Sequence, residues 1–204
     1  MGGVSAQAGP RLGQSLDDFP EASLQRLQHV YRSHHPSFGA AYFNGTESGR
    51  FNLLLGARGT CYVADDVETA VREKVRDIVL AQGIVPASLA RAFVVSAILA
   101  EQAFRCANVS DRDAAQHGVT RMLVTMDDYD VPQQWADAFA DAQFEGVRYS
   151  SRYTSGPENS WALFGDEGEH DFGTVTTELP GIDACGQAGI AVYSTPHSSD
   201  LDYT

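Results

Sequence analysis

The sequence predicts a single α+β domain with a mixed β-sheet core and flanking helices. Strand-like runs interleave with amphipathic helical segments, but without the regular strand–helix–strand repeat of a parallel sheet. Neither a GxGxxG nor a GxxxxGK(S/T) motif is present. The 204 residues are 43% hydrophobic and 20% charged. A chain of this length and composition can bury a core without disulfides or metal.

The first part of the chain is expected to be a flexible tail over residues 1–15, because these residues are small, polar and rich in glycine. Residues 16–204 are expected to form the domain. Apolar residues at helical spacing predict a short helix over Leu16–His29, and Val30–Arg32 then begins a strand. Residues 33–59 combine Gly, Ser, His and Asn with several aromatic residues, which is typical of a ligand-binding loop.

The next segment gives clearer signals. Thr60–Ala64 is rich in β-forming residues and predicts a strand. Asp65 and Asp66 follow it and are candidate N-caps for a helix from Val67 to Gln82, which carries one apolar face. The apolar, β-branched run Ala92–Leu99 predicts a buried strand.

The later elements are shorter. Helices are expected over Asp111–His117 and Pro132–Ala142. Gly146–Arg152 and Ser160–Phe164 are expected to form a strand pair around a turn at residues 154–158. Residues 166–204 form an acidic extension with weak β character near residues 174–177 and 190–193.

The formal net charge is −13, from 14 basic and 27 acidic residues. Residues 1–76 carry as many basic as acidic side chains, and no Lys or Arg follows Arg152, so the excess lies in the later part of the chain. Nucleic acids and anionic membranes both require a basic surface, so neither is an expected partner. No apolar run approaches the ~18 residues of a membrane span, and no secretory signal is visible. We therefore expect a cytoplasmic protein.

The three cysteines, Cys61, Cys106 and Cys185, match no CxxC or zinc-ribbon spacing. We expect free, buried thiols in a reducing compartment. His34-His35 is the only histidine pair, and no HExxH motif is present, so no metal site is expected. Asp127–Asp130 lacks the spacing of a calcium loop and predicts a solvated turn.

A series of short motifs carries the functional signal. Each motif is weak alone, but their order is specific. In chain order they are Tyr31-Arg32, Gly49-Arg50-Phe51-Asn52, Tyr62-Val63-Ala64, Ala70-Val-Arg-Glu73, Tyr149-Ser-Ser151-Arg152 and Trp161-Ala-Leu-Phe164. Over about residues 28–165 this series resembles the RES domain, a family named for its Arg, Glu and Ser residues.

The resemblance implies a fold similar to diphtheria-toxin-like ADP-ribosyltransferases and a site that consumes NAD⁺. It implies a toxin that degrades NAD⁺ by phosphorolysis, with phosphate as co-substrate, or by hydrolysis, or that transfers ADP-ribose to a protein. It also implies an Xre-type antitoxin as partner and no metal. Whether the chain forms a homo-oligomer stays open.

Carried over residue by residue, the resemblance assigns the site to eight positions. The expected catalytic residues are Glu73, Arg32 and Ser151, and the expected NAD⁺-binding residues are Arg50, Tyr62, Tyr31, Asn52 and Arg152.

The chemistry of these residue types agrees with the assignment. Cleavage of the nicotinamide–ribose bond passes through an oxocarbenium-like cation, which the Glu73 carboxylate would stabilise. Arg32 and Arg50 offer forked donors for a pyrophosphate. Tyr62 can stack on a nicotinamide or adenine ring, and Ser151 can hydrogen-bond a ribose hydroxyl or the nicotinamide amide.

Ordinary alternatives stay open for the charged residues. Glu73 is alternatively a solvated helix residue paired with Arg76, and Glu68 competes with it for the catalytic role. Arg32 and Arg50 are alternatively surface ion pairs.

The same holds for the remaining positions. Tyr62 is alternatively a core aromatic residue, and Ser151 a plain strand serine with Ser150 as its rival on the opposite face. A further reading of the whole chain is a non-catalytic NAD-binding or interaction protein that keeps the fold without the activity.

Overall fold

The structure is a computed structural model that describes residues 7–194, apart from the side chains of Asp77 and Leu80. Its centre is an eight-stranded sheet with the order β1-β7-β8-β9-β4-β2-β6-β11. Neighbouring strands are antiparallel except for the parallel pair β7–β8. The strands are β1 (Glu21–Leu24), β2 (His29–His34), β4 (Arg58–Ala64), β6 (Val94–Ala100), β7 (Phe104–Asn108), β8 (Gly146–Tyr149), β9 (Ser160–Asp166) and β11 (Gly173–Pro180).

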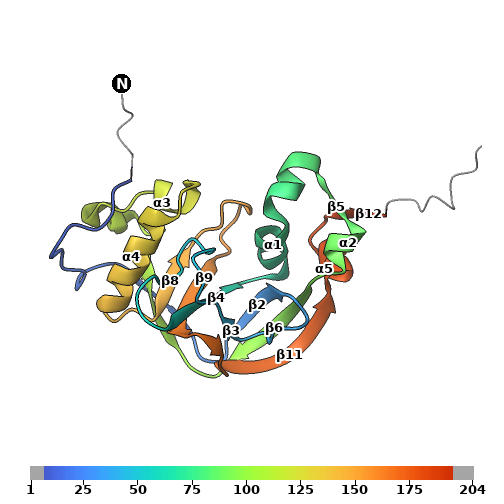
Figure 1. Cartoon of the computed structure of the whole chain (residues 1–204), viewed down its shortest axis with the longest axis horizontal. Helices are drawn as coiled ribbons and strands as arrows, with labels where there is room; N and C mark the ends of the chain where they lie inside the picture. Colours follow the sequence, from blue (N-terminus) through green and yellow to red (C-terminus); the bar gives the residue numbers. More distant parts are fainter. Residues whose placement is uncertain (1–6, 195–204) are drawn as a thin grey trace, which may run out of the picture.

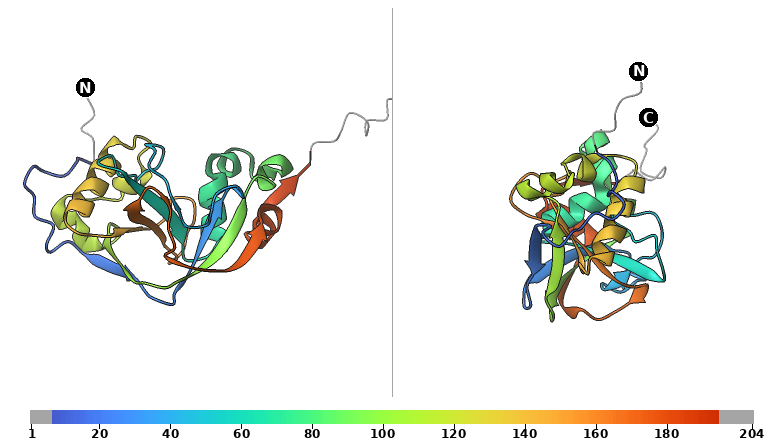
Figure 2. Two further views of the ribbon diagram at one scale, coloured as in Figure 1. Left: turned by 60° about the horizontal axis from the view of Figure 1, so that its bottom comes forward. Right: turned by 90° about the vertical axis from the view of Figure 1, so that its left-hand side faces the viewer.

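The helices form two groups that stand on the same side of this sheet (Figure 1). Helices α3 (Met122–Thr125) and α4 (Asp130–Asp141), together with the 3₁₀ helix η1 (Arg112–His117), lie near the β7–β8 end. Helices α1 (Val67–Gln82), α2 (Ala87–Ala90) and α5 (Gly181–Gln187) lie near the β6–β11 end. Figure 2 shows that the sheet curls into a crescent between the two groups.

Two small sheets complete the fold. Strand β3 (Tyr42–Phe43) pairs with β10 (Gly168–Glu169) in antiparallel orientation. Strand β5 (Ile84–Pro86) pairs with β12 (Ala191–Tyr193) in parallel orientation. The acidic segment after Asp166 is therefore structured up to β12, because it supplies an edge strand, a helix and half of each small sheet.

The apolar side chains divide into three clusters. The α4 cluster lies under α4 and includes Phe51, Trp135 and Phe139. The α1 cluster lies between α1, α5 and the sheet and includes Val71, Phe93 and Cys185. The third lies on the opposite face of the sheet and includes Phe43, Cys61, Leu163 and Phe172.

Strand alternation places the first two clusters on one face. Along β9, Ala162 and Phe164 belong to the α4 cluster, whereas Trp161 and Leu163 belong to the cluster on the opposite face. The α4 and α1 clusters occupy the two ends of the same face, so the middle of that face is left without an apolar cover.

Helix α1 has the bounds that the sequence predicts. Asp66 caps it, since its carboxylate accepts the Thr69 N–H at 2.8 Å and the Thr69 hydroxyl at 2.8 Å. Gly83 ends it in the left-handed region with φ 70°, where glycine carries no steric penalty. The helix is interrupted at Arg76, whose φ and ψ are 12° and −98°. Glu73 therefore lies in the first of its two parts.

The neighbouring Asp65 has a different role from capping. Its carboxylate accepts the Trp161 indole N–H at 2.8 Å, and from Asn159 the side-chain amide at 2.9 Å and the backbone N–H at 3.1 Å. It thus fastens the end of β4 to the start of β9. The Asp65-Asp66 pair links the sheet and the helix at the point where the chain passes between them.

The predicted mixed sheet with flanking helices is confirmed, as are strands near Val30, Thr60–Ala64 and Ala92–Leu99. The predicted helix over Leu16–His29 is wrong, because β1 occupies part of it and pairs with β7. Leu27 is exposed at a turn with φ 67°, so the helical spacing there was coincidental.

Two further elements differ from the sequence expectation. The helix expected over Asp111–His117 is a 3₁₀ helix. The strands β7 and β11 extend through segments for which the residue pattern predicts at most weak β character. β7 lies next to β8 and β11 next to β6, so sheet pairing rather than local pattern determines both.

Residues 7–15, which belong to the expected tail, contact the α4 end of the molecule. The Gln7 side-chain amide donates to the Gly118 carbonyl at 3.0 Å, and the Trp135 indole donates to the Ala8 carbonyl at 2.9 Å. Residues 1–6, like the last residues of the acidic extension, 195–204, lie outside the described part. The division of the chain at residue 16 stays a prediction.

Cys61, Cys106 and Cys185 are free and buried, as the sequence predicts. Burial raises the pKa of all three thiols. Among residues 7–194, no helix is long and apolar enough to cross a lipid bilayer.

Replacing the α1 cap tests this account of the helix. Asp66→Ala should lower the free energy of unfolding by about 1 kcal/mol, because two donors at the helix start lose their acceptor. Urea denaturation measures the change. Asp18→Ala is the matched control, since Asp18 is exposed and should change stability by less than about 0.5 kcal/mol. Equal stability of the two variants would contradict the capping role.

Candidate active site

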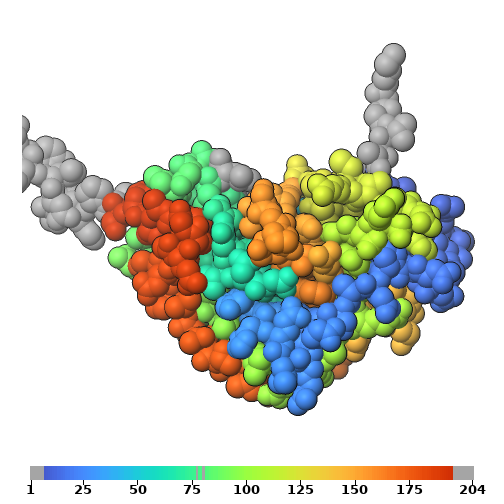
Figure 3. All heavy atoms as spheres, turned by 180° about the vertical axis from the view of Figure 1, so that it is seen from behind, coloured from blue at the N-terminus to red at the C-terminus, as the bar shows by residue number. Residues whose placement is uncertain are grey.

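A cavity of about 330 Å³ lies over the part of the sheet that the two apolar clusters leave uncovered. Its lining comes from β2, the loop over residues 44–52, β4, the first part of α1, and segments near residues 124–129 and 149–153. Seen from behind in Figure 3, the segment that follows β8 (orange) lies directly beside the start of α1 (teal). Elements far apart in sequence therefore enclose the site.

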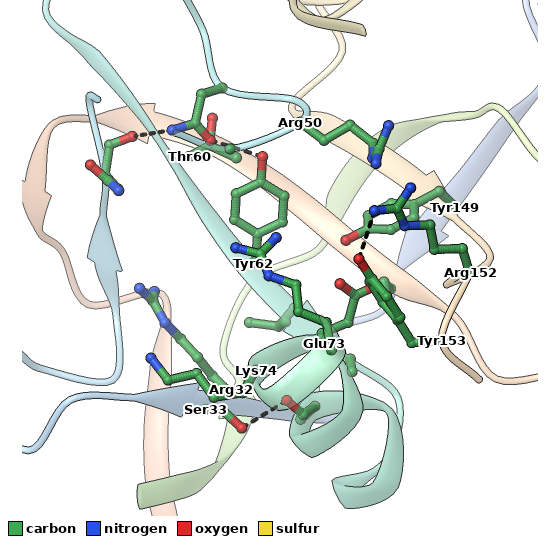
Figure 4. Close-up of a pocket in the computed structure, with 18 of the residues that line it drawn as sticks. Arg32, Ser33, Arg50, Thr60, Tyr62, Glu73, Lys74, Tyr149, Arg152 and Tyr153 are labelled. Atoms are coloured by element: carbon green, nitrogen blue, oxygen red, sulfur yellow. Dashed lines mark hydrogen bonds between the residues drawn. The ribbon is translucent and has the colours of Figure 1, made fainter. Parts of the chain in front are cut away.

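The cavity opens where β2 and β4 separate. These strands share a single residue pair, Tyr31 opposite Ala64, whereas β2 pairs with β6 along its whole length. Beyond that pair the gap between the strands is filled by side chains instead of backbone hydrogen bonds. Arg32 and Tyr62 both lie beside this gap (Figure 4).

Arg32 is held in the gap by contacts with β3 and β4. Its Nη1 donates to the Tyr42 carbonyl at 2.6 Å and to the Cys61 thiol. Burial raises the pKa of the Cys61 thiol, and the positive charge of Arg32 offsets part of the rise. Arg32 lines the cavity and has no ion-pair partner among the described residues, so no carboxylate neutralises its charge through direct contact.

Tyr62 stands at the centre of the cavity (Figure 4). Its hydroxyl donates to the Asn52 side-chain oxygen at 2.8 Å and accepts the Phe51 N–H at 2.8 Å. Burial raises the pKa of the Tyr62 hydroxyl, so the phenol stays protonated and can donate. These two hydrogen bonds hold the Tyr62 ring in place at its hydroxyl end.

The buried Asn52 side chain stabilises the loop that carries Arg50 through hydrogen bonds. Its amide donates to the carbonyls of Asn44 and Thr46, while its oxygen accepts from Tyr62. Gly49 packs against this pair so closely that a Cβ there would lie 2.6 Å from the Tyr62 hydroxyl, and closer still to Asn52. In the Gly-Arg-Phe-Asn motif, the absence of a side chain at Gly49 therefore leaves space for the Tyr62–Asn52 hydrogen bond.

Glu73 enters the cavity from the first part of α1. Burial raises the pKa of its carboxyl, and a hydrogen bond from the Ser151 hydroxyl offsets part of that rise. Three arginines offset it further through their positive charge: Arg76, Arg50 and Arg152. Glu68, the competing candidate, instead forms a surface ion pair with Arg72 at 2.7 Å and does not line the cavity.

Ser151 lies behind Glu73 rather than on the cavity surface. It is 7% exposed and does not line the cavity, and its oxygen also accepts the Tyr153 N–H at 3.1 Å. Ser151 therefore affects the pKa of the Glu73 carboxyl without itself lining the cavity. Tyr149, two residues earlier, is buried and lines the cavity beside Glu73.

Cationic side chains lie at both ends of the cavity (Figure 4). Arg50 and Arg152 lie at one end, with Tyr153, whose hydroxyl accepts from Arg152 at 2.8 Å. Arg32 and Lys74 lie side by side at the other end, and Glu73 and Tyr62 lie between them. Burial lowers the pKa of Arg50 and of Lys74.

The lining of the cavity is rich in cationic side chains, which suit an anion. Among the described residues, no group of three or more His, Cys, Asp or Glu side chains is placed to hold a metal ion. His34 is buried and engaged, since its ring nitrogens contact the Ser96 hydroxyl at 2.8 Å and the Phe38 carbonyl at 2.9 Å.

The RES domain family model matches residues 29–180, from the first residue of β2 to the last residue of β11. The chain belongs to the RES domain family. The match is longer than the resemblance over about residues 28–165 that the motifs predict, because β11 is part of the domain.

The fold of this RES domain is similar to that of a solved structure. A chain in the crystal structure of the M. tuberculosis MbcT–MbcA toxin–antitoxin complex is 16% identical, with a TM-score of 0.64. The likeness covers 82% of this chain and 92% of that chain. At this identity it concerns the fold alone. A comparison with curated proteins finds no match.

The structure brings most of the predicted residues of the RES domain to one cavity. Seven of them line it: Tyr31, Arg32, Arg50, Asn52, Tyr62, Glu73 and Arg152. Ser151 reaches it only through Glu73. Their roles in binding or catalysis stay predictions.

Sequence reasoning missed other lining residues. Lys74 and Arg76 are close to Glu73 on α1, and Arg76 is one helical turn away, so helix spacing could have found it. Tyr149 could have been found because it precedes Ser151 by two positions in the same strand run. Tyr129, in the acidic segment that was predicted to be a solvated turn, had no sequence signal.

The packing of Gly49 can be tested by adding one methyl group. Gly49→Ala should lower the free energy of unfolding by about 1–3 kcal/mol, because the Cβ displaces the Tyr62–Asn52 hydrogen bond. Gly186→Ala is the matched control, since nothing lies within 4 Å of a Cβ there and its helix α5 should gain slightly. Chemical denaturation compares the two, and a Gly49→Ala protein as stable as the wild type would refute the packing argument.

Proposed function

We propose that this RES domain protein binds NAD⁺ in the cavity and cleaves the nicotinamide–ribose bond. The observation that carries the proposal is a single acidic side chain, Glu73, among the described residues that line a cation-rich cavity. A cavity of about 330 Å³ is within the size range of small-molecule sites.

Glu73 suits the stabilisation of a developing positive charge. As the nicotinamide leaves, the ribose acquires oxocarbenium character, and an ionised carboxylate held nearby favours that state over the substrate. Burial increases the effect because the surrounding medium screens charge poorly. Ser151 supports this role through its hydrogen bond, which favours the ionised form and orients the carboxylate.

The arginine end of the cavity suits the pyrophosphate. Arg50 and Arg152 present guanidinium groups from two different elements, and guanidinium matches the geometry of phosphate oxygens. Tyr62 and Tyr31 offer aromatic surfaces on the sheet floor for the nicotinamide ring. Asn52 acts in this proposal by holding Tyr62, since its hydrogen bonds go to the protein.

The acceptor of the ADP-ribose group is either phosphate or water. Arg32 and Lys74, at the end away from the arginine pair, would hold an inorganic phosphate there, which favours phosphorolysis. Transfer to a protein is the second candidate within the same chemistry. A fold similar to diphtheria-toxin-like ADP-ribosyltransferases is part of this proposal.

The biological setting we propose is a toxin–antitoxin pair. The fold likeness to a chain of a toxin–antitoxin complex supports it. The protein would then act on cytoplasmic NAD⁺ and be restrained by an Xre-type antitoxin.

Turnover of NAD⁺ by the purified protein is the central test. Nicotinamide should appear, with ADP-ribose 1″-phosphate as co-product if phosphate is the acceptor and ADP-ribose if water is. Glu73→Gln should lower kcat by about 100-fold or more, because the stabilising charge is lost. Chromatography of the products with and without phosphate measures this. Glu68→Gln is the matched control on the same helix and should keep full activity.

Each alternative gives a distinct result in this assay. Label from NAD⁺ on a macromolecule would indicate protein ADP-ribosylation, and NAD⁺ binding without products would indicate a non-catalytic protein. An inactive wild type, or full activity in Glu73→Gln, would overturn the proposal.

The pH dependence tests the link between Ser151 and Glu73. The carboxylate must be ionised, so kcat/KM should rise with pH through its raised pKa. Ser151→Ala removes a hydrogen bond to the ionised form, which raises this pKa further and moves the acid limb to higher pH. Ser150→Ala should leave the limb in place. If Ser151→Ala lowers the plateau of the kcat/KM profile but leaves its acid limb at the same pH, the result would instead indicate that Ser151 binds substrate directly.

A further inference from the structure

Three arginines that line the cavity, Arg50, Arg152 and Arg76, contact one short segment, residues 123–129, which includes most of α3 and the residues after it. Arg50 donates through Nη1 to the carbonyls of Met126 and, at 3.5 Å, Leu123. Arg152 donates to the Thr125 carbonyl at 2.8 Å and to Asp127 at 3.0 Å. These arginines come from the loop before β4 and from the segment after β8, so the chain segment between them is held from two sides.

Tyr129 is the side chain on this segment that contacts two of the arginines. The Arg50 guanidinium carbon lies 4.7 Å from the centre of its ring. Its hydroxyl accepts from Arg76 Nη1 at 3.4 Å. Tyr129 lines the cavity, and its backbone carbonyl accepts the Gln133 N–H at 2.9 Å at the start of α4. Tyr129 therefore contacts Arg50 from the loop before β4 and Arg76 from α1, while its backbone is hydrogen-bonded to the start of α4.

The arginines repel one another, so their arrangement needs support from the protein. The positive charge of Arg152 lowers the pKa of Arg50, in addition to the larger lowering by burial. Among residues 7–194, the one carboxylate with a described ion pair to either arginine is Asp127, which is 96% exposed and so weakly effective. In the described part of the chain, further support comes from the backbone carbonyl groups, from Tyr153 beside Arg152, and from the Glu73 carboxylate near Arg50. For Arg50 it also comes from the Tyr129 ring, whose negative face attracts a guanidinium.

We propose that Tyr129 is a positioning residue for the pyrophosphate of the substrate, a role that rests on the function proposed above. Its ring holds the Arg50 guanidinium in place, and its hydroxyl draws Arg76 from α1 toward the same point. When the pyrophosphate binds, the guanidinium groups that donate to it are already held close together, and its negative charge offsets their mutual repulsion. Tyr129 acts through the arginines and makes no chemical step itself.

A positioning role predicts a split between KM and kcat. Tyr129→Leu should raise KM for NAD⁺ by about fivefold, the order of a lost cation–π contact, with little change in kcat. Tyr129→Phe keeps the ring and should restore most of the loss. Tyr193→Leu, at a tyrosine of β12 that does not line the cavity, is the matched control and should keep the wild-type KM.

A double-mutant cycle tests whether Tyr129 acts through Arg50. Arg50→Lys should raise KM, and Tyr129→Leu added to it should raise KM much less than it does alone. Arg76→Gln, at an exposed side chain, tests the second contact without disturbing the core and should have less effect in a Tyr129→Phe background. Calorimetry with ADP-ribose should show the same pattern in Kd, and thermal unfolding should show that each variant is folded.

The outcomes separate this proposal from the function itself. A wild type that neither turns over NAD⁺ nor binds ADP-ribose overturns both. An active wild type in which Tyr129→Leu keeps its KM, or loses kcat alone, or adds fully to Arg50→Lys, overturns only the role of Tyr129. If Tyr129→Leu fails to fold, independent effects of Arg76→Gln and Tyr129→Phe overturn that role.

Discussion

The single residue pair that joins β2 to β4, Tyr31 opposite Ala64, is the constraint on which the site depends. Two strands that paired along their whole length would close the sheet and leave no space between Arg32 and Tyr62. Because they part after one pair, a side chain from each strand can reach the same cavity. The apolar clusters under α4 and α1 then cover the two ends of this face and leave the cavity between them open to a ligand.

The electrostatics of the cavity follow from this architecture. One carboxylate, Glu73, is surrounded by cations that come from separate elements. Among the described residues, the ion pair that one of these cations forms, Arg152 with Asp127, neutralises little charge because Asp127 is 96% exposed. The acidic residues after Arg76 contribute nothing to the lining in the described part of the chain. An acidic protein can thereby present a cationic cavity to an anionic ligand, because what a ligand meets is the local field rather than the net charge.

Local signals predicted much of the fold and of the site. The cap at Asp66 and the glycine after Gln82 set the bounds of α1, since both act within one turn of the chain. Strand β7 was not predicted, and the long edge strand β11 was predicted only as weak β character near residues 174–177, because the pairing partners that define both strands are distant in sequence. Tyr129 was missed for the same reason, since its contacts with Arg50 and Arg76 join three segments far apart in sequence.

The sequence by itself determined the family signature, the capped helix that carries Glu73, and the glycine beside Asn52. These depend on short-range chemistry, in which residue type and spacing are sufficient. The tertiary structure alone decided that Ser151 reaches the cavity through Glu73, that Arg50 and Arg152 also hold the segment at residues 123–129, and that the acidic C-terminal segment completes the sheet. Such arrangements depend on which distant elements pack together, and packing is a property of the whole core.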